Sequence, residues 1–321
     1  MNPAIPALAC LLSLASAPAA AQEPAPAGKL AFKMLQGVFE GPETGVAGRT
    51  RATCRFEPVL KGTWIRFHYR SHDGKTPIYS FLEMLRVFPD GSVEAWHFDD
   101  AGNLMAAKGR VDAEGMTLKS FGPEGDLLWM LRDDWVADYH RMTVRSRPDA
   151  DHDLQVVLQG FYRPHPEAPP APPGPAAWER VRATAYAPWL GTFEGREKTD
   201  MGISRGRIES GPILDGSWIL TRYCSTAEGG REVYAGLGLI QCNSSGEYIL
   251  HWFDTTGDQQ RIDGAIDSQG AVAHVHSPAG EVLERHTDRF IPGGYRFLIE
   301  TRTSKDAAWK PFLSADYLRV D

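Results

Sequence analysis

The chain repeats its own pattern, and this duplication constrains the fold more than any other feature. Residues 37–41 read GVFEG, and residues 191–195 read GTFEG at a spacing of 154 positions. Residues 61–65 (KGTWI) and 215–219 (DGSWI) match at the same spacing. Further matches, at spacings of 155 and then 156, pair Phe98, Asp99, Gly102, Gly109, Gly115, Tyr139 and Phe161 with Phe253, Asp254, Gly257, Gly264, Gly270, Tyr295 and Tyr317. A repeat of this length predicts one domain fold built twice.

Each repeat carries short strand-like segments separated by glycine turns. Residues 64–69 and 81–88 are rich in β-branched and aromatic residues, and Asp-Gly pairs follow each at 73–74 and 90–91. This pattern is typical of an antiparallel meander, and we count about ten strands in each repeat. Closing such a meander removes its exposed edges. We therefore predict an all-β protein of two tandem, antiparallel, up-and-down β-barrels of about ten strands each.

Proline and helix signals set the expected domain limits. Residues 164–175 contain seven prolines in twelve positions, which favours an extended, semi-rigid spacer. Short helices are expected at 29–35 and 178–186, each with an apolar side against a barrel mouth before a first strand. The predicted organisation is a signal peptide at 1–21, repeat 1 at 30–163, a linker at 164–177 and repeat 2 at 178–321.

The N-terminal segment predicts export. Residues 1–21 hold no charged residue, include an apolar run at 7–15, and end in three alanines before Gln22. This is typical of a cleaved secretory signal peptide, so we expect a periplasmic or secreted protein. No other stretch is long and apolar enough to span a bilayer. The net charge of −7, with no basic run, argues against nucleic acids and anionic membranes as partners.

Three cysteines remain after the predicted cleavage, namely Cys54, Cys224 and Cys242. If the strands around 229–230 form a hairpin, Cys224 faces about residue 235. Cys242 then lies about 23 Å further along, at about 3.3 Å per residue. That separation exceeds the reach of a disulfide, so we expect three free thiols and no redox pair or zinc site.

The two repeat openings resemble the lipocalin and fatty-acid-binding-protein superfamily, the calycins. Calycin barrels begin with a short 3₁₀ turn and a Gly-x-Trp signature, to which residues 37–39 (GVF) and 191–193 (GTF) correspond with phenylalanine in place of tryptophan. In lipocalins an arginine of the last strand packs over that aromatic residue. The resemblance assigns this role to Arg163 and Arg319.

Each repeat is more closely similar to a family of uncharacterised bacterial lipocalin-like domains. That family's pattern includes an opening Gly-x-Trp-Glu-Gly, a tryptophan strand, a Trp-x-Asp-x-x-Gly turn and a closing Tyr-x-Arg. Residues 191–195, 215–218, 252–257 and 317–319 match these motifs in order, and residues 97–102 match the turn motif in repeat 1. The resemblance covers nearly all of the chain after the leader, except the linker. The family carries no established reaction, so the resemblance implies a fold and no chemistry.

Aromatic and polar residues on the predicted strands are the candidate ligand-binding residues. An aromatic-lined cavity with a few polar groups suits a small apolar or aromatic ligand, whereas a filled core would use the same residue types. His68 shares a strand face with Trp64 and Arg66, and this face is either the lumen or an outer surface against the sister domain. The candidates are Trp64, Arg66, His68, Tyr69, Tyr79, Trp96, His97, Trp218, Arg222, Tyr223, Tyr234, His251 and Trp252.

His274 and His276 have a spacing that metal sites use, and His286 or Asp288 could supply a third ligand. In one strand register His274 faces Arg285, and a slip of one residue brings His286 onto the same face. With only two firm ligands, we predict no metal. A haem-binding barrel of related shape would need an axial histidine, but we predict no cofactor.

Three hypotheses about function follow. The leading one is an exported, non-enzymatic, lipocalin-like protein that binds a small apolar or aromatic molecule. The second is an isomerase, lyase or hydrolase that uses His68, His97 and Arg66 in one barrel, which requires their side chains to converge. The third is a scaffold whose two repeats pack on each other and present a protein-binding surface. We expect any function to lie where the repeats differ.

Overall fold

The computed structural model describes residues 34–46, 48–74, 76–166, 174–199, 202–241, 245–277 and 279–320. The predicted signal peptide, most of the expected helix at 29–35 and Cys242 lie outside these residues, as does the central part of the predicted linker. No helix within the described ranges is long and apolar enough to cross a membrane.

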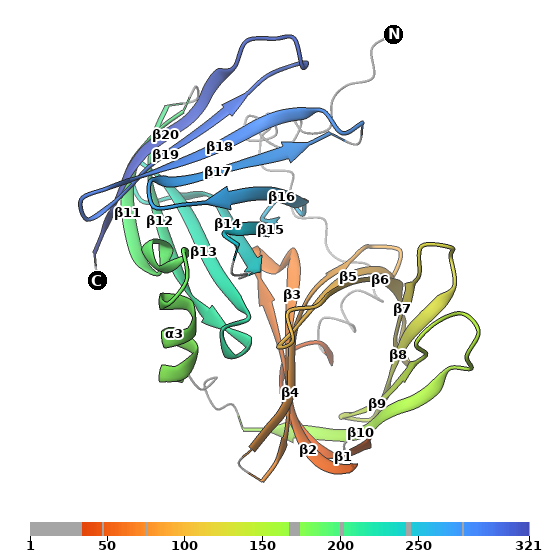
Figure 1. Cartoon of the computed structure of the whole chain (residues 1–321). Coiled ribbons are helices and arrows are strands. Elements are labelled where there is room, and N and C mark those ends of the chain that lie inside the picture. The colour runs from red at the N-terminus through yellow and green to blue at the C-terminus, as the bar shows by residue number, and fades with distance from the viewer. Residues whose placement is uncertain are drawn as a thin grey trace. The chain divides into compact units, whose positions relative to one another are not determined.

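The first repeat forms a closed, ten-stranded antiparallel barrel, barrel 1, in which each strand pairs with the next and β1 pairs with β10 (Figure 1). Its strands are β1 (Gly37–Gly45), β2 (Gly48–Val59), β3 (Trp64–Asp73), β4 (Thr76–Val87), β5 (Ser92–Asp99), β6 (Leu104–Val111), β7 (Gly115–Phe121), β8 (Leu127–Val136), β9 (Tyr139–Ser146) and β10 (Gln155–His165). A 3₁₀ turn, η2 (Leu60–Gly62), separates β2 from β3.

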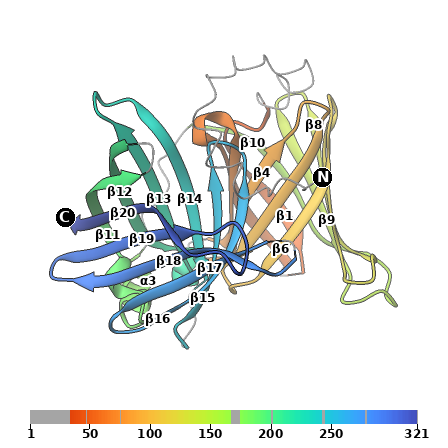
Figure 2. The same ribbon diagram turned by 90° about the horizontal axis from the view of Figure 1, so that it is seen from above.

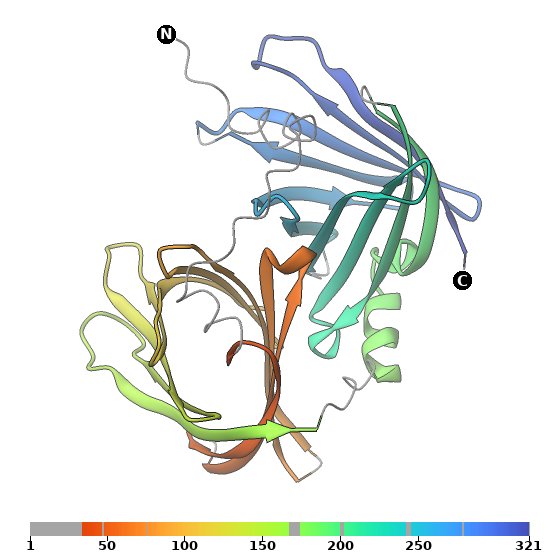
Figure 3. The same cartoon turned by 180° about the vertical axis from the view of Figure 1, so that it is seen from behind.

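The second repeat forms a second closed barrel of the same kind, barrel 2, which β11 and β20 close. Its strands are β11 (Gly191–Thr199), β12 (Gly202–Ile213), β13 (Trp218–Ala227), β14 (Glu232–Gln241), β15 (Glu247–Asp254), β16 (Gln259–Ile266), β17 (Gly270–His276), β18 (Val282–Ile291), β19 (Gly294–Thr301) and β20 (Lys310–Arg319). Figure 3 shows the strands of each barrel following one another in chain order. The predicted fold class is therefore confirmed.

A helix and two 3₁₀ turns belong to barrel 2. Helix α3 (Pro175–Arg182) begins with proline at its first position, where the missing N–H costs nothing, and buries Ala177 and Val181. It lies against η4 (Leu214–Gly216) at the end of β12. Val181 also joins the apolar core of barrel 2, together with η3 (Ala187–Trp189). The apolar side of this segment thus closes one end of barrel 2, which we call the capped end.

Hairpin register determines which side chains face the lumen. Figure 2 shows β12, β13 and β14 side by side in barrel 2. Cys224 pairs with Ala235, as the sequence predicted, and Cys54 and Cys224 are free thiols. Gly270 approaches the next strand so closely that a Cβ atom there would lie 1.9 Å from the carbonyl oxygen of Asp288. This glycine therefore allows β17 and β18 to meet beside Asp288.

The register corrects one part of the internal alignment. Glu43 pairs with Gly160 in barrel 1, and its counterpart Glu197 pairs with Ala315 in barrel 2. Tyr317 therefore corresponds to Tyr162, and the predicted match with Phe161 is wrong by one residue. The same slip makes His140, rather than Tyr139, the counterpart of Tyr295. A shift of one residue exchanges the two faces of a strand, so the correction changes which residues are compared in the lumen.

Candidate functional site

Large apolar side chains pack together in the lumen of barrel 1. The rings of Phe56 and Phe67 stack with centroids 4.2 Å apart, and Phe81 packs edge-on against Phe67 at 5.2 Å. Met116 and Leu118, from β7, belong to the same buried core. A ten-stranded barrel is wider than one of eight strands, so it needs such bulky residues to be solid.

The counterparts of these five residues in barrel 2 are all smaller: Ser210, Thr221, Gly236, Ala271 and Ala273. Barrel 2 contains a cavity of about 450 Å³, and Ser210, Thr221 and Ala273 are among its lining residues. This volume lies within the usual range for small-molecule sites. The smaller side chains of Ser210, Thr221 and Ala273 thus leave room for a ligand in barrel 2, whereas the ring of Trp252 occupies the space beside Gly236.

Aromatic rings make up much of the cavity wall. Trp189 closes the capped end and packs edge-on against Tyr248, with ring centroids 5.2 Å apart. Residues near the opposite strand ends, such as Thr199 and Arg231, also line the cavity. The aromatic lining residues are Trp189, Tyr223, Tyr234, Tyr248, Trp252, Tyr295, Phe297, Phe312 and Tyr317.

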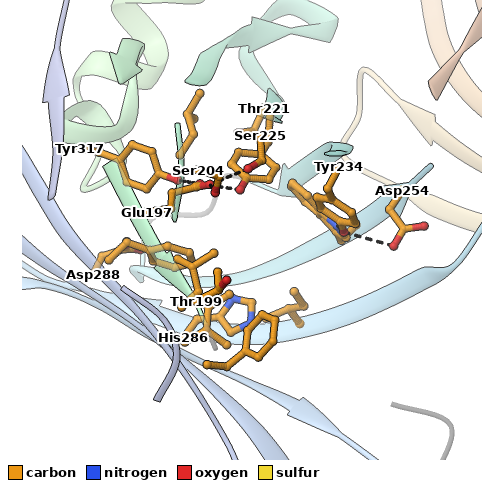
Figure 4. Close-up of a pocket in the computed structure, with 18 of the residues that line it drawn as sticks. Glu197, Thr199, Ser204, Thr221, Ser225, Tyr234, Asp254, His286, Asp288 and Tyr317 are labelled. Carbon is orange, nitrogen blue, oxygen red and sulfur yellow. Dashed lines mark hydrogen bonds between the residues drawn. The ribbon is translucent and has the colours of Figure 1, made fainter. Parts of the chain in front are cut away.

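Glu197 is the centre of a hydrogen-bond network in the cavity wall (Figure 4). Its side chain is buried and accepts hydrogen bonds from Ser204 (2.6 Å), Ser225 (2.6 Å), Tyr223 (2.5 Å) and Tyr317. Burial and the neighbouring carboxylate raise the pKa of both tyrosines, which therefore stay protonated donors. Four donors satisfy this carboxylate without any ligand.

Barrel 1 contains the same network around Glu43. Its carboxylate accepts hydrogen bonds from Tyr69 (2.6 Å), Tyr162 (2.9 Å), Thr50 (2.7 Å) and Ser71. Because the same network occurs in both barrels, we assign it to the barrel fold rather than to ligand recognition.

A second polar group lies near the opposite side of the cavity in Figure 4. The Tyr234 hydroxyl donates to Asp254 (3.1 Å) and accepts from the Trp252 indole N–H (2.8 Å). The corresponding set in barrel 1 joins His97 to Glu83 (2.9 Å) and to the hydroxyl of Tyr79 (3.0 Å). Both sets have internal partners.

Strand β18 presents three ionisable side chains to the cavity, namely Glu284, His286 and Asp288. The Nε2 atom of His286 donates a hydrogen bond to Glu284 at 2.5 Å. The counterparts of Glu284 and His286 in barrel 1 are Trp129 and Leu131. Barrel 2 has therefore replaced two apolar core residues by a hydrogen-bonded polar pair.

Asp288 differs from its counterpart Asp133 in its partners. Asp133 accepts hydrogen bonds from His140 Nδ1 (2.7 Å) and Trp135 Nε1 (3.1 Å), and both His140 and Asp133 are fully buried. In barrel 2 these two partners are replaced by Tyr295 and Phe290. Within the described ranges, no residue donates a hydrogen bond to Asp288. Burial raises the pKa of its carboxyl group to about 7, and the nearby His286 opposes this rise.

The strand faces decide where the predicted site residues lie. Ile65, Phe67 and Tyr69 belong to the core of barrel 1, so the alternating residues of β3 face outward. Of the thirteen candidates, Tyr223, Tyr234 and Trp252 line the cavity of barrel 2. Tyr69, Tyr79 and His97 face the lumen of barrel 1. The outward-facing candidates are Trp64, Arg66, His68, Trp96, Trp218, Arg222 and His251.

The polar cluster expected for an enzyme does not assemble. His97 points into barrel 1, whereas His68 and Arg66 lie on the outward face of β3. Burial and nearby arginines lower the pKa of His68 to about 4. Arg66 forms an ion pair with Glu57 at 2.7 Å. These three side chains therefore share no cavity.

The register also separates the histidines considered for a metal. His274 pairs with Arg285, so His286 lies on the opposite face of the sheet, toward the cavity. Across the described ranges, no group of three or more histidine, cysteine, aspartate or glutamate side chains is arranged to hold a metal ion.

The sequence analysis missed Glu197 and Glu284, and it considered His286 and Asp288 only as metal ligands. One signal was available, because Glu43 and Glu197 match at the spacing of 154. Asp133 and Asp288 match at 155 in the same way. An acidic residue in a strand is normally interpreted as solvent-exposed, and only the strand register shows that these residues point inward.

The resemblance implied that an arginine of each last strand packs over the phenylalanine of the opening motif. Barrel 2 has this contact. The Arg319 guanidinium lies over the ring of Phe193, 4.7 Å from its centroid. In barrel 1, Arg163 lies over Tyr139 at 5.2 Å instead.

No protein-family model and no curated protein matches the chain. Among solved structures it is similar to Rv2717c from M. tuberculosis, with 18% identity and a TM-score of 0.37 over 45% of this chain and 100% of that one. It is also similar to a protein of unknown function of the DUF3598 family from Nostoc punctiforme, with 12% identity and a TM-score of 0.29 over 91% and 98%. A designed fluorescence-activating β-barrel shows 23% identity and a TM-score of 0.23 over 43% and 99%. Conclusions about function therefore rest on the residues of this chain.

Proposed function

We propose that the chain is an exported, lipocalin-like protein in which barrel 2 binds a small, largely apolar or aromatic molecule. The observation that carries this proposal is the cavity of about 450 Å³ in barrel 2, at positions where barrel 1 is filled. Aromatic walls with a few polar groups are the usual composition of a small-molecule site.

The comparison between the barrels supports a division of roles. The rings of Phe56, Phe67 and Phe81 pack together in the core of barrel 1. Barrel 2 keeps the Glu197 network that the two barrels share, but it has lost the bulk of that stack. Under this proposal barrel 1 is structural and the chain binds one ligand.

The direct test is titration with N-phenyl-1-naphthylamine, an apolar dye whose fluorescence rises in an apolar site. We expect one dye per chain. Thr221→Phe and Ala273→Leu each install the barrel 1 residue in the cavity, and we expect each to abolish dye binding by occupying the space.

Val272→Leu is the matched control. Val272 directly precedes Ala273 in β17, but its side chain lies on the outer face and is 43% exposed. It should bind dye as the wild type does. The proposal fails if the wild-type chain binds no dye, or if both cavity-filling variants fold and still bind it.

A further inference from the structure

We infer that the ligand of barrel 2 carries a cationic nitrogen, which Asp288 and the aromatic rings around it bind. This inference rests on the proposed binding function and specifies the chemical class of the ligand. It follows from the distribution of charge in the cavity, from the missing partners of Asp288 and from the rings beside it.

Negative groups dominate the cavity lining. Its carboxyl groups belong to Glu197, Asp254, Glu284 and Asp288. The basic side chains among the described lining residues are Arg231 and His286. Arg231 is exposed and precedes β14 at the end of the barrel opposite the cap. The interior therefore favours a positive ligand group over a negative one.

Three of the four carboxyl groups have partners. Glu197 accepts four hydroxyl hydrogen bonds, Asp254 accepts from Tyr234 and from its own turn, and Glu284 accepts from His286. Asp288 accepts none from any described residue. Asp288 is half-buried and lines the cavity, where a bound ammonium group would supply both the opposite charge and a hydrogen-bond donor.

Three aromatic residues of the cavity wall lie near the same carboxyl group. Phe297 is its direct cross-strand neighbour on β19 and shares its face. Tyr295 and Tyr248 are close enough for the charge of Asp288 to raise the pKa of their hydroxyls. The faces of aromatic rings attract cations, and aromatic cages bind quaternary ammonium groups in this way.

Barrel 1 supplies an internal comparison. There one carboxylate oxygen of the equivalent Asp133 accepts hydrogen bonds from His140 and Trp135, the other oxygen has no partner among the described residues, and Met116 and Leu118 belong to the core. Barrel 2 keeps the aspartate but loses both partners and gains the cavity. The cavity beside Asp288 leaves room for an external partner in place of the two that barrel 1 supplies.

The ionisation of Asp288 makes cation binding depend on pH. The pKa of Asp288 is about 7, so its ionised fraction increases about tenfold between pH 6 and pH 8. The other titratable groups facing it are His286 on β18, Tyr295 on β19 and Tyr248 on β15, while β17 contributes Ala271. Both tyrosines stay neutral in this range. Binding of a cation should therefore strengthen as the pH rises.

The test compares decylammonium, decanol and decanoate, which share one alkyl chain, by calorimetry on the full chain below the micelle concentration. At pH 8 we expect the ammonium compound to bind roughly tenfold or more tightly than decanol, and decanoate to bind most weakly. Asp288→Asn should remove roughly tenfold of the ammonium affinity, so that the ammonium compound no longer binds more tightly than decanol. Asp263→Asn is the control, because it removes an exposed carboxylate that pairs with Arg261.

The possible failures can be told apart. If decanol binds and the ammonium compound binds no more tightly, the inference is overturned and the proposed function stands. The same holds if Asp288→Asn keeps the preference for ammonium. Should this variant not fold, the wild type decides the matter, since ammonium affinity that does not rise between pH 6 and pH 8 overturns the inference. If none of the three compounds nor the dye binds, the proposed function fails as well.

Discussion

Asp288 occupies in barrel 2 the position that Asp133 occupies in barrel 1, but only Asp133 accepts a hydrogen bond from a histidine, His140, at 2.7 Å. The two carboxyl groups lie on equivalent strands but have different neighbours. In barrel 1 the aspartate completes a buried pair, and in barrel 2 it faces a cavity. Variants at this position should therefore behave differently in the two barrels.

Removal of His140 should destabilise barrel 1 strongly. His140→Ala removes the ring nitrogen that donates to the buried Asp133 carboxyl group at 2.7 Å, and a buried acceptor that loses such a donor costs about 1–3 kcal/mol or more. Hydrogen exchange of peptides from β8 and β9 measures this loss locally. His152→Ala is the control, because its pair with Asp149 is exposed and should contribute at most about 1 kcal/mol. Equal protection in the two variants would contradict the prediction.

The carboxyl group of Asp288 should make barrel 2 less stable as the pH rises. Its pKa of about 7 in the folded state exceeds the usual value of about 4 for an unfolded aspartate. Between these values the folded state binds the extra proton, so the free energy of unfolding falls as the pH rises from 4 to 7 and is then level.

The measurement is the unfolding of wild type and Asp288→Asn at several pH values. The asparagine variant lacks this titration. We therefore expect its free energy of unfolding to rise relative to that of the wild type by up to a few kcal/mol between pH 4 and pH 7. Parallel stability curves for the two proteins would show that Asp288 ionises normally.

The glutamate networks should contribute similarly to both barrels. Glu197→Gln replaces an acceptor of four hydrogen bonds by an amide that accepts at one atom only, which leaves buried hydroxyls poorly paired at a cost of about 1–3 kcal/mol or more. Glu43→Gln should cost barrel 1 a similar amount. The control is Glu194→Gln on the outer face of β11, where exposed pairs with Arg205 and Arg207 contribute little. Denaturant unfolding of the three variants ranks them.

The duplication and the turn spacing were sufficient to predict the fold. Glycine turns repeat within each half, and the hairpin geometry even placed Cys224 opposite residue 235, where Ala235 lies. Such features are local, because a turn and the alternation of a strand fix a hairpin without distant contacts.

The direction of each strand face could not be predicted in the same way. Trp64, Ile65, Phe67 and Tyr69 on β3 are all buried, so neither face of this strand is polar along its whole length. Alternation identifies the lumen only where one face is polar. The cavity was hidden for a related reason, since the small residues Ser210, Thr221 and Ala273 that line it lie on β12, β13 and β17 and become neighbours only after the barrel closes.

Reversal of one of those substitutions should open barrel 1. Phe67 lies between the rings of Phe56 and Phe81, and Phe67→Thr installs the barrel 2 residue at this position. We expect a loss of about 3–5 kcal/mol, as for other large-to-small core changes. An apolar cavity of this origin should stay dry and bind benzene, which would restore part of the lost protection of barrel 1 peptides in hydrogen exchange. Wild-type barrel 1 peptides should show no such gain, because the ring of Phe67 already occupies the space. If benzene protects neither protein there, the lumen of barrel 1 has collapsed around the substitution, and bulk at this one position does not decide whether a barrel of this chain is hollow.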